Sequence, residues 1–203
     1  MQLYYASTSP YVRKVWVCAQ VLGLTENIER LDSAAHPVER DERIAGFNPL
    51  AKVPALRTND GLCLYDSRVI CEYLNEQARG CLFPSHGEAR WISLTRQALG
   101  DGLLDAALLA RYEFSARPAD KQWQRWADAQ LEKVAAALAD IERQVEQFSA
   151  EPHDIGLITI GCALGYLDFR FATLDWRTAH PLTAAWFARF DEHPAMAATR
   201  PHF

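Results

Sequence analysis

Residues 48–70 read NPLAKVPALRTNDGLCLYDSRVI, and this stretch decides the fold class of the first half of the chain. Two short apolar segments, at 55–58 and 62–65, are predicted to be strands of one hairpin. Asn59-Asp60-Gly61 lies between them, and an Asp-Gly pair favours a tight turn. Ser67 is predicted to begin a helix, because serine is favoured at helix starts. A hairpin that leads directly into a helix is typical of a small mixed α/β unit.

The residues before this stretch supply the rest of that unit. Short apolar and aromatic segments predict strands, and apolar residues at steps of three and four predict helices. The predicted elements are a strand at 2–7, a helix at 10–22, a weak strand at 28–31 and a short helix at 38–46. With the hairpin and its helix they give the order β-α-β-α-β-β-α.

The second half of the chain has a different pattern. Glycine and proline residues interrupt regular structure over 79–87, which predicts a linker. Beyond the linker only helices are predicted: one at 88–117, one with apolar residues from 131 to 148, one with apolar residues from 160 to 171, and one at 182–192. The predicted domains are therefore 1–80 and 87–203, the second of them a helical bundle.

Charge and composition restrict the partners. The formal net charge is −5, and the basic side chains are dispersed among acidic ones. Binding to a nucleic-acid backbone needs concentrated Lys and Arg, so no nucleic-acid partner is expected. No apolar stretch approaches the roughly 20 residues that span a bilayer, so no membrane partner is expected.

The cysteines and the first residues indicate the compartment. Residues 1–7 do not resemble the basic and apolar segments of a secretory signal. The five cysteines show no C-x-x-C spacing and fit neither a disulfide framework nor a zinc site. We therefore expect a cytoplasmic protein with reduced thiols and no metal.

The start of the first predicted helix carries three hydroxyl residues, Ser7, Thr8 and Ser9, before Pro10. For the fold alone, Ser9 as the N-cap and Pro10 as the first helical residue are a sufficient explanation. The position also suits chemistry, because a hydroxyl beside the positive end of a helix stabilises a thiolate, which is the nucleophilic form. Ser9 is preferred because it directly precedes Pro10, and Ser7 and Thr8 stay open as alternatives.

Val53-Pro54 directly precedes the first strand of the hairpin. One explanation is an ordinary trans proline that begins an edge strand. The other is a cis bond that turns the backbone N–H and C=O of Val53 towards a bound extended peptide. The spacing alone leaves both open.

Asp66-Ser67 follows the second strand of the hairpin. Both residues are common helix caps, which explains the pair structurally. A helix N-terminus with a serine also binds a carboxylate, and the neighbouring aspartate accepts from an ammonium group. The pair therefore suits the two charges of an α-amino acid.

Sites for sulfur, for peptide backbone and for an amino-acid head group together suit the tripeptide γ-glutamyl-cysteinyl-glycine. The sequence resembles the glutathione S-transferase family, and is similar to serine-type, zeta- and tau-like bacterial members. The segments that carry the resemblance are Ser9 to Arg13 (S-P-[FY]-x-R), Asn48 to Pro54 (N-P-x-x-x-V-P), Asp66 to Ile70 ([ED]-S-x-x-I), and Trp186 to Thr199 with His193-Pro194 and Pro201 (W-x-x-R-x-x-x-x-P). The match covers nearly the whole chain.

The resemblance implies an α/β thioredoxin-like N-terminal domain, an all-α helical-bundle C-terminal domain and a homodimer. It implies glutathione as a co-substrate, without a metal. It also implies that Ser9 is the catalytic residue hydrogen-bonded to the glutathione sulfur. The residues that it implies hold glutathione are Ser9, Lys52, Val53, Asp66 and Ser67, although a solvated Lys52 is an equally good interpretation.

The second substrate is expected in a pocket of the helical domain. The candidate lining residues are Leu108, Arg111, Tyr112, Phe114 and Phe171. The alternative is that these side chains are plain core, since apolar and aromatic residues at helical spacing pack in most helices.

The predicted function is a glutathione transferase of detoxification, which conjugates the thiolate to a small apolar electrophile. Isomerisation, dehalogenation and peroxide reduction on the same site stay open. The alternative from another class is a non-catalytic interaction module with the same fold. A thiol-exchange mechanism is disfavoured, because no cysteine lies near Ser9.

One departure from the family pattern concerns a helix start. The family's buried helix often begins with S/T-x-x-D, and the segment taken to correspond is Thr159-Ile160-Gly161-Cys162. Cys162 stands where the aspartate is usual, so we expect half of a helix cap to be missing, at a cost of about 0.5–2 kcal/mol.

Overall fold

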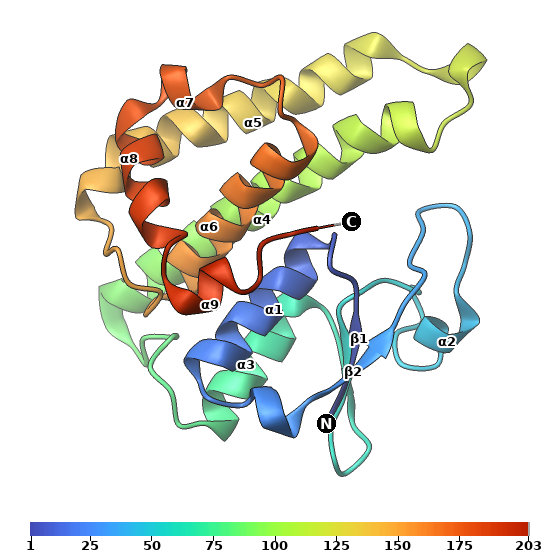
Figure 1. Cartoon of the computed structure of the whole chain (residues 1–203), viewed down its shortest axis with the longest axis vertical. Coiled ribbons are helices and arrows are strands. Elements are labelled where there is room, and N and C mark those ends of the chain that lie inside the picture. Colours follow the sequence, from blue (N-terminus) through green and yellow to red (C-terminus); the bar gives the residue numbers. More distant parts are fainter. Residues whose placement is uncertain (203) are drawn as a thin grey trace.

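The computed structural model describes residues 1–202, which form a mixed sheet with helices followed by a helical half (Figure 1). The strands are β1 (Gln2–Tyr5), β2 (Glu29–Asp32), β3 (Ala55–Arg57) and β4 (Cys63–Leu64). Their order in the sheet is β2-β1-β3-β4, with β1 and β2 parallel and the other neighbours antiparallel. This arrangement and the helices after it confirm the predicted fold class.

Helices cover both faces of the sheet. Those of the first half are α1 (Pro10–Val21), α2 (Glu42–Ala45), α3 (Ser67–Gln77) and the 3-10 turn at Thr25–Asn27. Leu3 and Leu56 point into the core shared with α1 and α3, whereas Tyr4 packs with Ile44 of α2 on the opposite face. α2 is shorter than predicted because Asp41 is its N-cap, accepting a hydrogen bond from the Arg43 N–H.

The second half contains no strand within residues 81–202. Its helices are α4 (Gly87–Ser115), α5 (Gln124–Gln144), α6 (Ile155–Arg170), α7 (Trp176–Ala179), α8 (Pro181–Phe190) and α9 (Pro194–Ala197), with 3-10 turns at Ala119–Lys121 and Val145–Gln147. α4 and α5 form a long antiparallel pair that extends away from the sheet (Figure 1). α7 and α9 were not predicted, because four residues are too few to show a helical period.

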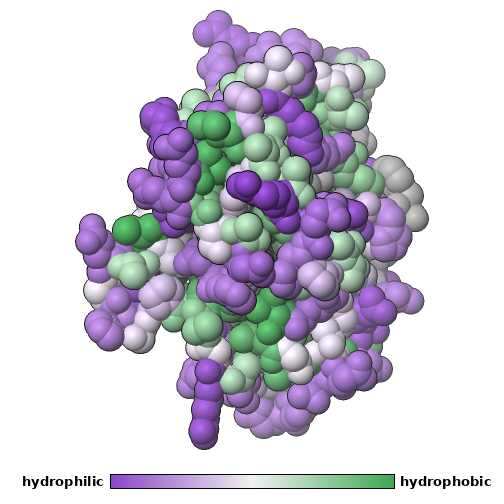
Figure 2. Space-filling view, turned by 60° about the vertical axis from the view of Figure 1, so that its left-hand side comes forward, coloured by the Kyte–Doolittle hydropathy of each residue, from purple (hydrophilic) through white to green (hydrophobic). Residues whose placement is uncertain are grey.

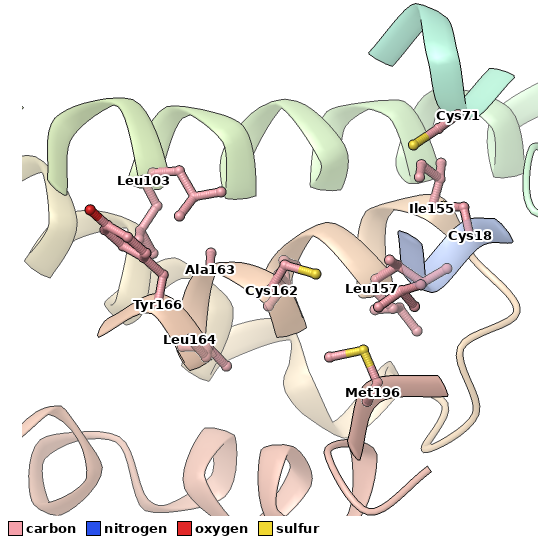
Figure 3. Packing of buried hydrophobic residues seen from close by; sticks show 14 of the residues in the cluster. Cys18, Cys71, Leu103, Ile155, Leu157, Cys162, Ala163, Leu164, Tyr166 and Met196 are labelled. Atoms are coloured by element: carbon pink, nitrogen blue, oxygen red, sulfur yellow. The ribbon is translucent and has the colours of Figure 1, made fainter. Parts of the chain in front are cut away.

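α6 is the centre of the molecule. Its residues from Ile155 to Leu167 are all buried, because α6 is apolar on every side and is surrounded by other elements. Figure 3 shows this packing, with Cys162 of α6 between Leu103 of α4 and Met196 of α9. One continuous core therefore joins the two halves of the chain.

The start of α6 differs from the prediction. Its N-cap is Asp154, whose Oδ1 accepts a hydrogen bond from the Leu157 N–H at 3.0 Å. Thr159 lies inside the helix and donates its hydroxyl proton to the Ile155 carbonyl at 2.7 Å. Placing the cap at Thr159 to Cys162 was therefore wrong, because an aspartate five residues earlier already accepts from the free N–H groups.

Arg13 of α1 connects the two halves through a buried guanidinium. Its Nη2 donates to Asp191 Oδ1 at 2.8 Å and to the Met196 carbonyl at 3.0 Å, and its Nε donates to Thr199 Oγ1 at 3.3 Å. Gly165 of α6 leaves room for this side chain, since a Cβ there would lie 2.1 Å from Arg13 Nη1. A buried charge with several acceptors fixes α1 against the last helices.

The surface mixes charged and apolar side chains. Figure 2 shows one face, on which separate hydrophobic patches lie among hydrophilic residues. Across residues 1–202, none of the helices combines the length and the apolar character that crossing a membrane requires.

Candidate functional site

The register of the sheet brings the three predicted ligand-binding segments to one end. β1 and β3 are antiparallel, as are β3 and β4. The last residues of β1, the first residues of β3 and the last residues of β4 therefore lie at the same end of the sheet. Ser9 follows β1, Val53 precedes β3 and Asp66 follows β4. Figure 1 shows β1 running from the N-terminus towards the start of α1, which lies at this end of the sheet.

Ser9 caps α1. Its Oγ accepts a hydrogen bond from the Val12 N–H at 3.3 Å, and Pro10 is the first helical residue. The first turn contains no acidic residue, so no neighbouring carboxylate of α1 offsets the positive end of the helix. Because Oγ is the acceptor in this bond, the hydroxyl proton can be donated to an anion.

The alternative hydroxyls occupy different positions. The Ser7 hydroxyl donates to the His202 carbonyl at 3.1 Å, so it contacts the C-terminal segment. Thr8 is half-buried and lies one residue before the cap. Of the three, Ser9 alone caps α1, and its oxygen therefore points to the helix N-terminus.

Tyr11 fixes the beginning of α1 to the helical half. Its hydroxyl donates a short hydrogen bond to Asp105 Oδ1 of α4. Burial raises the pKa of Tyr11 well above its usual range, and the hydrogen bond to Asp105 raises it further. Tyr11 is therefore a neutral donor, and it holds Asp105 of α4 against the first turn of α1.

The loop before β3 is held from within. The Val53–Pro54 bond is cis, as is the Tyr65–Asp66 bond. Asn48 is buried, and its side-chain amide donates to the Lys52 carbonyl at 2.9 Å while its oxygen accepts from the Leu50 N–H at 3.0 Å. The Lys52 side chain is exposed at the rim.

Asp66 and Ser67 begin α3. Asp66 is the N-cap, and its Oδ1 accepts from the Arg68 N–H at 2.9 Å. Ser67 is only 2% exposed and is the first residue of the helix. The guanidinium Nε of Arg68 lies 3.5 Å from Asp66 Oδ2, so this helix start presents an anion, a cation and free backbone N–H groups together.

A buried ion pair lies beneath the site. Lys14 of α1 donates to Asp101 Oδ1 of α4 at 2.6 Å, and both side chains are almost completely buried. Arg68 Nε lies 3.4 Å from the other carboxylate oxygen of Asp101. Burial raises the pKa of the Asp101 carboxyl, and the positive charges of Lys14 and Arg68 oppose that rise.

The candidate electrophile residues divide into two groups. Tyr112 stacks near Arg111, with the guanidinium 5.7 Å from the ring centre, and the Phe171 ring lies 6.4 Å from that of Tyr166. Leu108, one turn after Asp105, is half-buried and packs against the main core. Phe114 is 47% exposed at the far end of α4, and it takes part neither in the Arg111–Tyr112 contact nor in the Tyr166–Phe171 contact.

Several residues at this end of the molecule were not assigned a role from the sequence. Tyr11, Arg13, Asn48 and Arg68 lie within the segments that resemble the family, but the sequence assigns none of them a function of its own. Buried polar side chains with partners distant in sequence leave no local signal, so only the structure identifies them. Within residues 1–202, no group of three or more His, Cys, Asp or Glu is arranged to hold a metal ion.

Comparison with known proteins shows which family the chain is similar to. The family model described as the N-terminal domain of glutathione S-transferase matches residues 8–77. An uncharacterised GST-like protein of Escherichia coli, YibF, is 32% identical over 99% of this chain and 98% of its own length.

Two solved structures are similar along the whole chain. A glutathione transferase family member from Pseudomonas fluorescens Pf-5 with bound glutathione is 43% identical, with a TM-score of 0.94 over 100% of this chain and 99% of that chain. A family member from the same organism with bound S-(propanoic acid)-glutathione is 42% identical, with a TM-score of 0.89 over 99% of each chain.

Proposed function

Because the chain belongs to the glutathione S-transferase family, we propose that it binds glutathione as a thiolate and transfers it to a small electrophile with an apolar body. The observation that carries the proposal is the meeting of Ser9, Val53 and Asp66-Ser67 at one end of the sheet. Glutathione bound in the similar structure from Pseudomonas fluorescens supports the ligand, and the bound thioether in the second one supports a site that accepts conjugates.

In the proposed complex, each part of the tripeptide has a partner. The Ser9 hydroxyl donates to the sulfur, and the backbone of Val53 pairs with the cysteinyl residue. Asp66 accepts from the ammonium group, and the N-terminus of α3 with Ser67 holds the carboxylate. Lys52, at the exposed rim of the loop, is a weaker contact through its charge.

The chemistry assigned to Ser9 is stabilisation of the anion. A hydroxyl donor and the positive end of α1 both favour the thiolate over the thiol, so the pKa of bound glutathione falls. The sulfur then forms a bond to the electrophilic carbon, and the leaving group departs with its electron pair. Binding of the whole tripeptide orients the sulfur for this attack.

The test is a rate comparison on an aryl halide after retention on immobilised glutathione. Ser9→Ala is expected to lower kcat/KM by about 10- to 100-fold, because a hydrogen bond to a charged group contributes about 1.5–3 kcal/mol. The pH at which the rate is half-maximal should rise in this variant, because the bound thiol regains its proton more readily.

Thr8→Ala and Ser7→Ala serve as matched controls that remove the neighbouring hydroxyls. An unchanged rate in Ser9→Ala, with a loss in one of the controls, would transfer the role to that residue and remove the serine-type assignment of Ser9. Retention on glutathione without turnover of any electrophile would favour the non-catalytic module.

We also propose that the protein is a homodimer. Val69 of α3 and Trp91 and Ile92 of α4 are large apolar side chains that are exposed, Trp91 to 66%. Arg90 of α4 pairs with Glu72 of α3 at 2.9 Å, so the helix segments that carry these side chains meet at this ion pair. Exposed apolar groups that flank such a contact support an interface with a second copy.

The free cysteines support a reducing compartment, and we propose a cytoplasmic role in detoxification. All five cysteines are unpaired, and Cys18, Cys71 and Cys162 are buried. Burial raises the pKa of the Cys162 thiol to about 12, so this thiol stays protonated and unreactive.

A further inference from the structure

The facing parts of α4 and α6 carry a cationic and aromatic cluster that the proposed transfer step does not use. It consists of Arg111 and Tyr112 on α4 and Tyr166 and Arg170 on α6. The Arg111 guanidinium lies 5.7 Å from the ring centre of Tyr112, and the Arg170 guanidinium lies 4.2 Å from the ring centre of Phe169.

The four side chains act on one another electrostatically. Burial raises the pKa of Tyr166 to about 12, and the positive charges of Arg111 and Arg170 act against that rise. Burial and the neighbouring charge of Arg111 both lower the pKa of Arg170.

The packing of the helices places the two arginines at the same level. Gly100 of α4 lies against Thr159 of α6, where an added Cβ would be 2.9 Å from Thr159 Cγ2, and α4 and α6 run in the same direction (Figure 1). Arg111 and Arg170 each follow that contact by eleven residues, so two positive charges lie where the helices face each other.

The cluster lies further along the helix that contacts the first turn of α1. Tyr11, two residues after Ser9, donates to Asp105 of α4, so Asp105 lies against the turn at whose start the sulfur is proposed to bind. Arg111 follows Asp105 by six residues, which is roughly 9 Å along a helix. Half-buried Leu108 lies between them and offers an apolar contact.

We propose that the second substrate carries a carboxylate, which Arg111 binds with support from Tyr112, Tyr166 and the charge of Arg170, while its apolar body lies along Leu108. This substrate class rests on the proposed function, because it places the electrophilic carbon beside a sulfur held at Ser9. A guanidinium matches a carboxylate with two parallel hydrogen bonds, and tyrosine hydroxyls add further donors. The cluster thereby selects acids over neutral molecules of the same shape.

The test compares two glutathione thioethers of the same size, S-(4-carboxybutyl)glutathione and its primary amide, by calorimetry. The four-carbon chain separates the sulfur from the carboxylate. With the length of the Ser9 hydrogen bond, this separation matches the rise of roughly 9 Å along α4 from Asp105 to Arg111. The acid is expected to bind about tenfold more tightly than the amide, and Arg111→Met should remove that preference.

Arg170→Met is a second variant, and it keeps the test valid even if Arg111→Met does not fold. It should also reduce the preference for the acid over the amide. Arg189→Met is the matched control, because Arg189 is an exposed arginine on α8, and it should keep the full preference.

Glutathione itself is measured with every protein. If glutathione binds and the acid and amide bind equally, the carboxylate proposal is wrong and the proposed function stands. If glutathione does not bind to the wild-type protein, the proposed function is wrong, and the carboxylate proposal that rests on it is wrong as well. A preference for the acid that survives in both arginine variants would also overturn the assignment.

Discussion

At the scale of single residues, the Lys14–Asp101 pair is the most consequential contact outside the proposed ligand site. Both charges lie in the interior, where each has lost its hydration and depends on the other. Asp101 also lies near Arg68, so the pair is connected to the start of α3. Removing one member should therefore cost more than removing both.

We predict that Lys14→Met lowers the free energy of unfolding by about 3–5 kcal/mol, because it leaves a buried carboxylate without its partner. The double variant Lys14→Met/Asp101→Leu should recover most of that loss. Urea denaturation of the two variants measures the difference. If the double variant is less stable than Lys14→Met alone, the unpaired Asp101 carboxylate is not the cause of the loss in Lys14→Met.

The sequence predicted some residues of the site and not others, for a physical reason. Ser9, Val53-Pro54 and Asp66-Ser67 each stand at the junction of a strand and a helix, where local sequence determines caps and turns. Arg68 and Tyr11 act through partners on α4, and nothing near them in sequence indicates this. The roles of the predicted residues stay predictions until the Ser9 variants are measured.

At the scale of elements, glycines determine how closely α4 approaches α6. A Cβ added at Gly100 would lie 2.9 Å from Thr159 Cγ2 and 3.1 Å from the backbone of Ile160. A Cβ added at Gly102, on the same helix, would have no atom within 4 Å. An alanine at Gly100 therefore tests the close packing of the two helices, and an alanine at Gly102 tests helix propensity alone.

We predict that Gly100→Ala destabilises the protein by about 1–3 kcal/mol, since the backbone of α6 must move. Gly102→Ala should stabilise it by about 0.5–1 kcal/mol, because alanine is the better helix former. Thermal or urea unfolding of both variants provides the comparison. Equal effects of the two substitutions would contradict the close contact at Gly100.

A carboxylate from α5 caps α8. Glu142 accepts from the Leu182 N–H at 2.9 Å and from the Thr183 N–H at 2.8 Å. Burial tends to raise the pKa of Glu142, but the hydrogen bonds from Thr183 and Leu182 outweigh it, and the net direction is down. The folded pKa then lies below the unfolded value of about 4.3, so the stabilisation is complete above that value and is lost as the pH falls through the folded pKa.

We predict that Glu142→Gln is less stable than the wild type at pH 7 by about 1 kcal/mol, and that the difference narrows below pH 4 or so. Urea unfolding over a pH series measures this. Glu146→Gln, at an exposed acidic residue, should show no such narrowing. A difference that is the same at all pH values would rule out the capping role of the charge.

Element by element, the sequence predicted the types well and the boundaries less well. Long periodic helices were found, whereas α7 and α9 were missed and the start of α6 was placed too late. Asp154 determines that start, and its signal is a single residue that the periodicity does not include. The domain boundaries 1–80 and 87–203 stay a prediction; α3 ends at Gln77 and α4 begins at Gly87.

At the scale of the whole molecule, the exposed apolar surface on α3 and α4 predicts the oligomeric state. Trp91 and Trp123 are both exposed tryptophans, to 66% and 61%. Trp91 directly follows Arg90, whose ion pair with Glu72 joins α4 to α3, whereas Trp123 precedes α5 near the far end of α4. Only the first should lie in the interface between two copies.

We predict that the wild-type protein has twice the mass of the chain by light scattering and that Trp91→Glu has the mass of one chain. A charge placed in an apolar contact loses its hydration without a partner, which separates the copies. Trp123→Glu, the matched control, should keep the mass of the wild type. A monomeric wild type at micromolar concentration would refute the dimer.

How the two halves pack could not be predicted from the sequence. The periodicity of α6 indicated a buried face but not that every face is covered. Arg13 looked like one basic residue in a matched segment, and its burial depends on residues more than 170 positions later. Such contacts form only when the whole chain is folded.

The position of Arg13 also bears on how the protein is made. Its acceptors are translated 178 to 186 residues after it, when helix α1 has long left the ribosome. During synthesis the guanidinium must therefore stay hydrated, and the buried contacts of Arg13 can form only after residues around Thr199 emerge. In a nascent chain halted before that point, α1 should be sensitive to proteolysis. Once the finished polypeptide is released, α1 should become resistant.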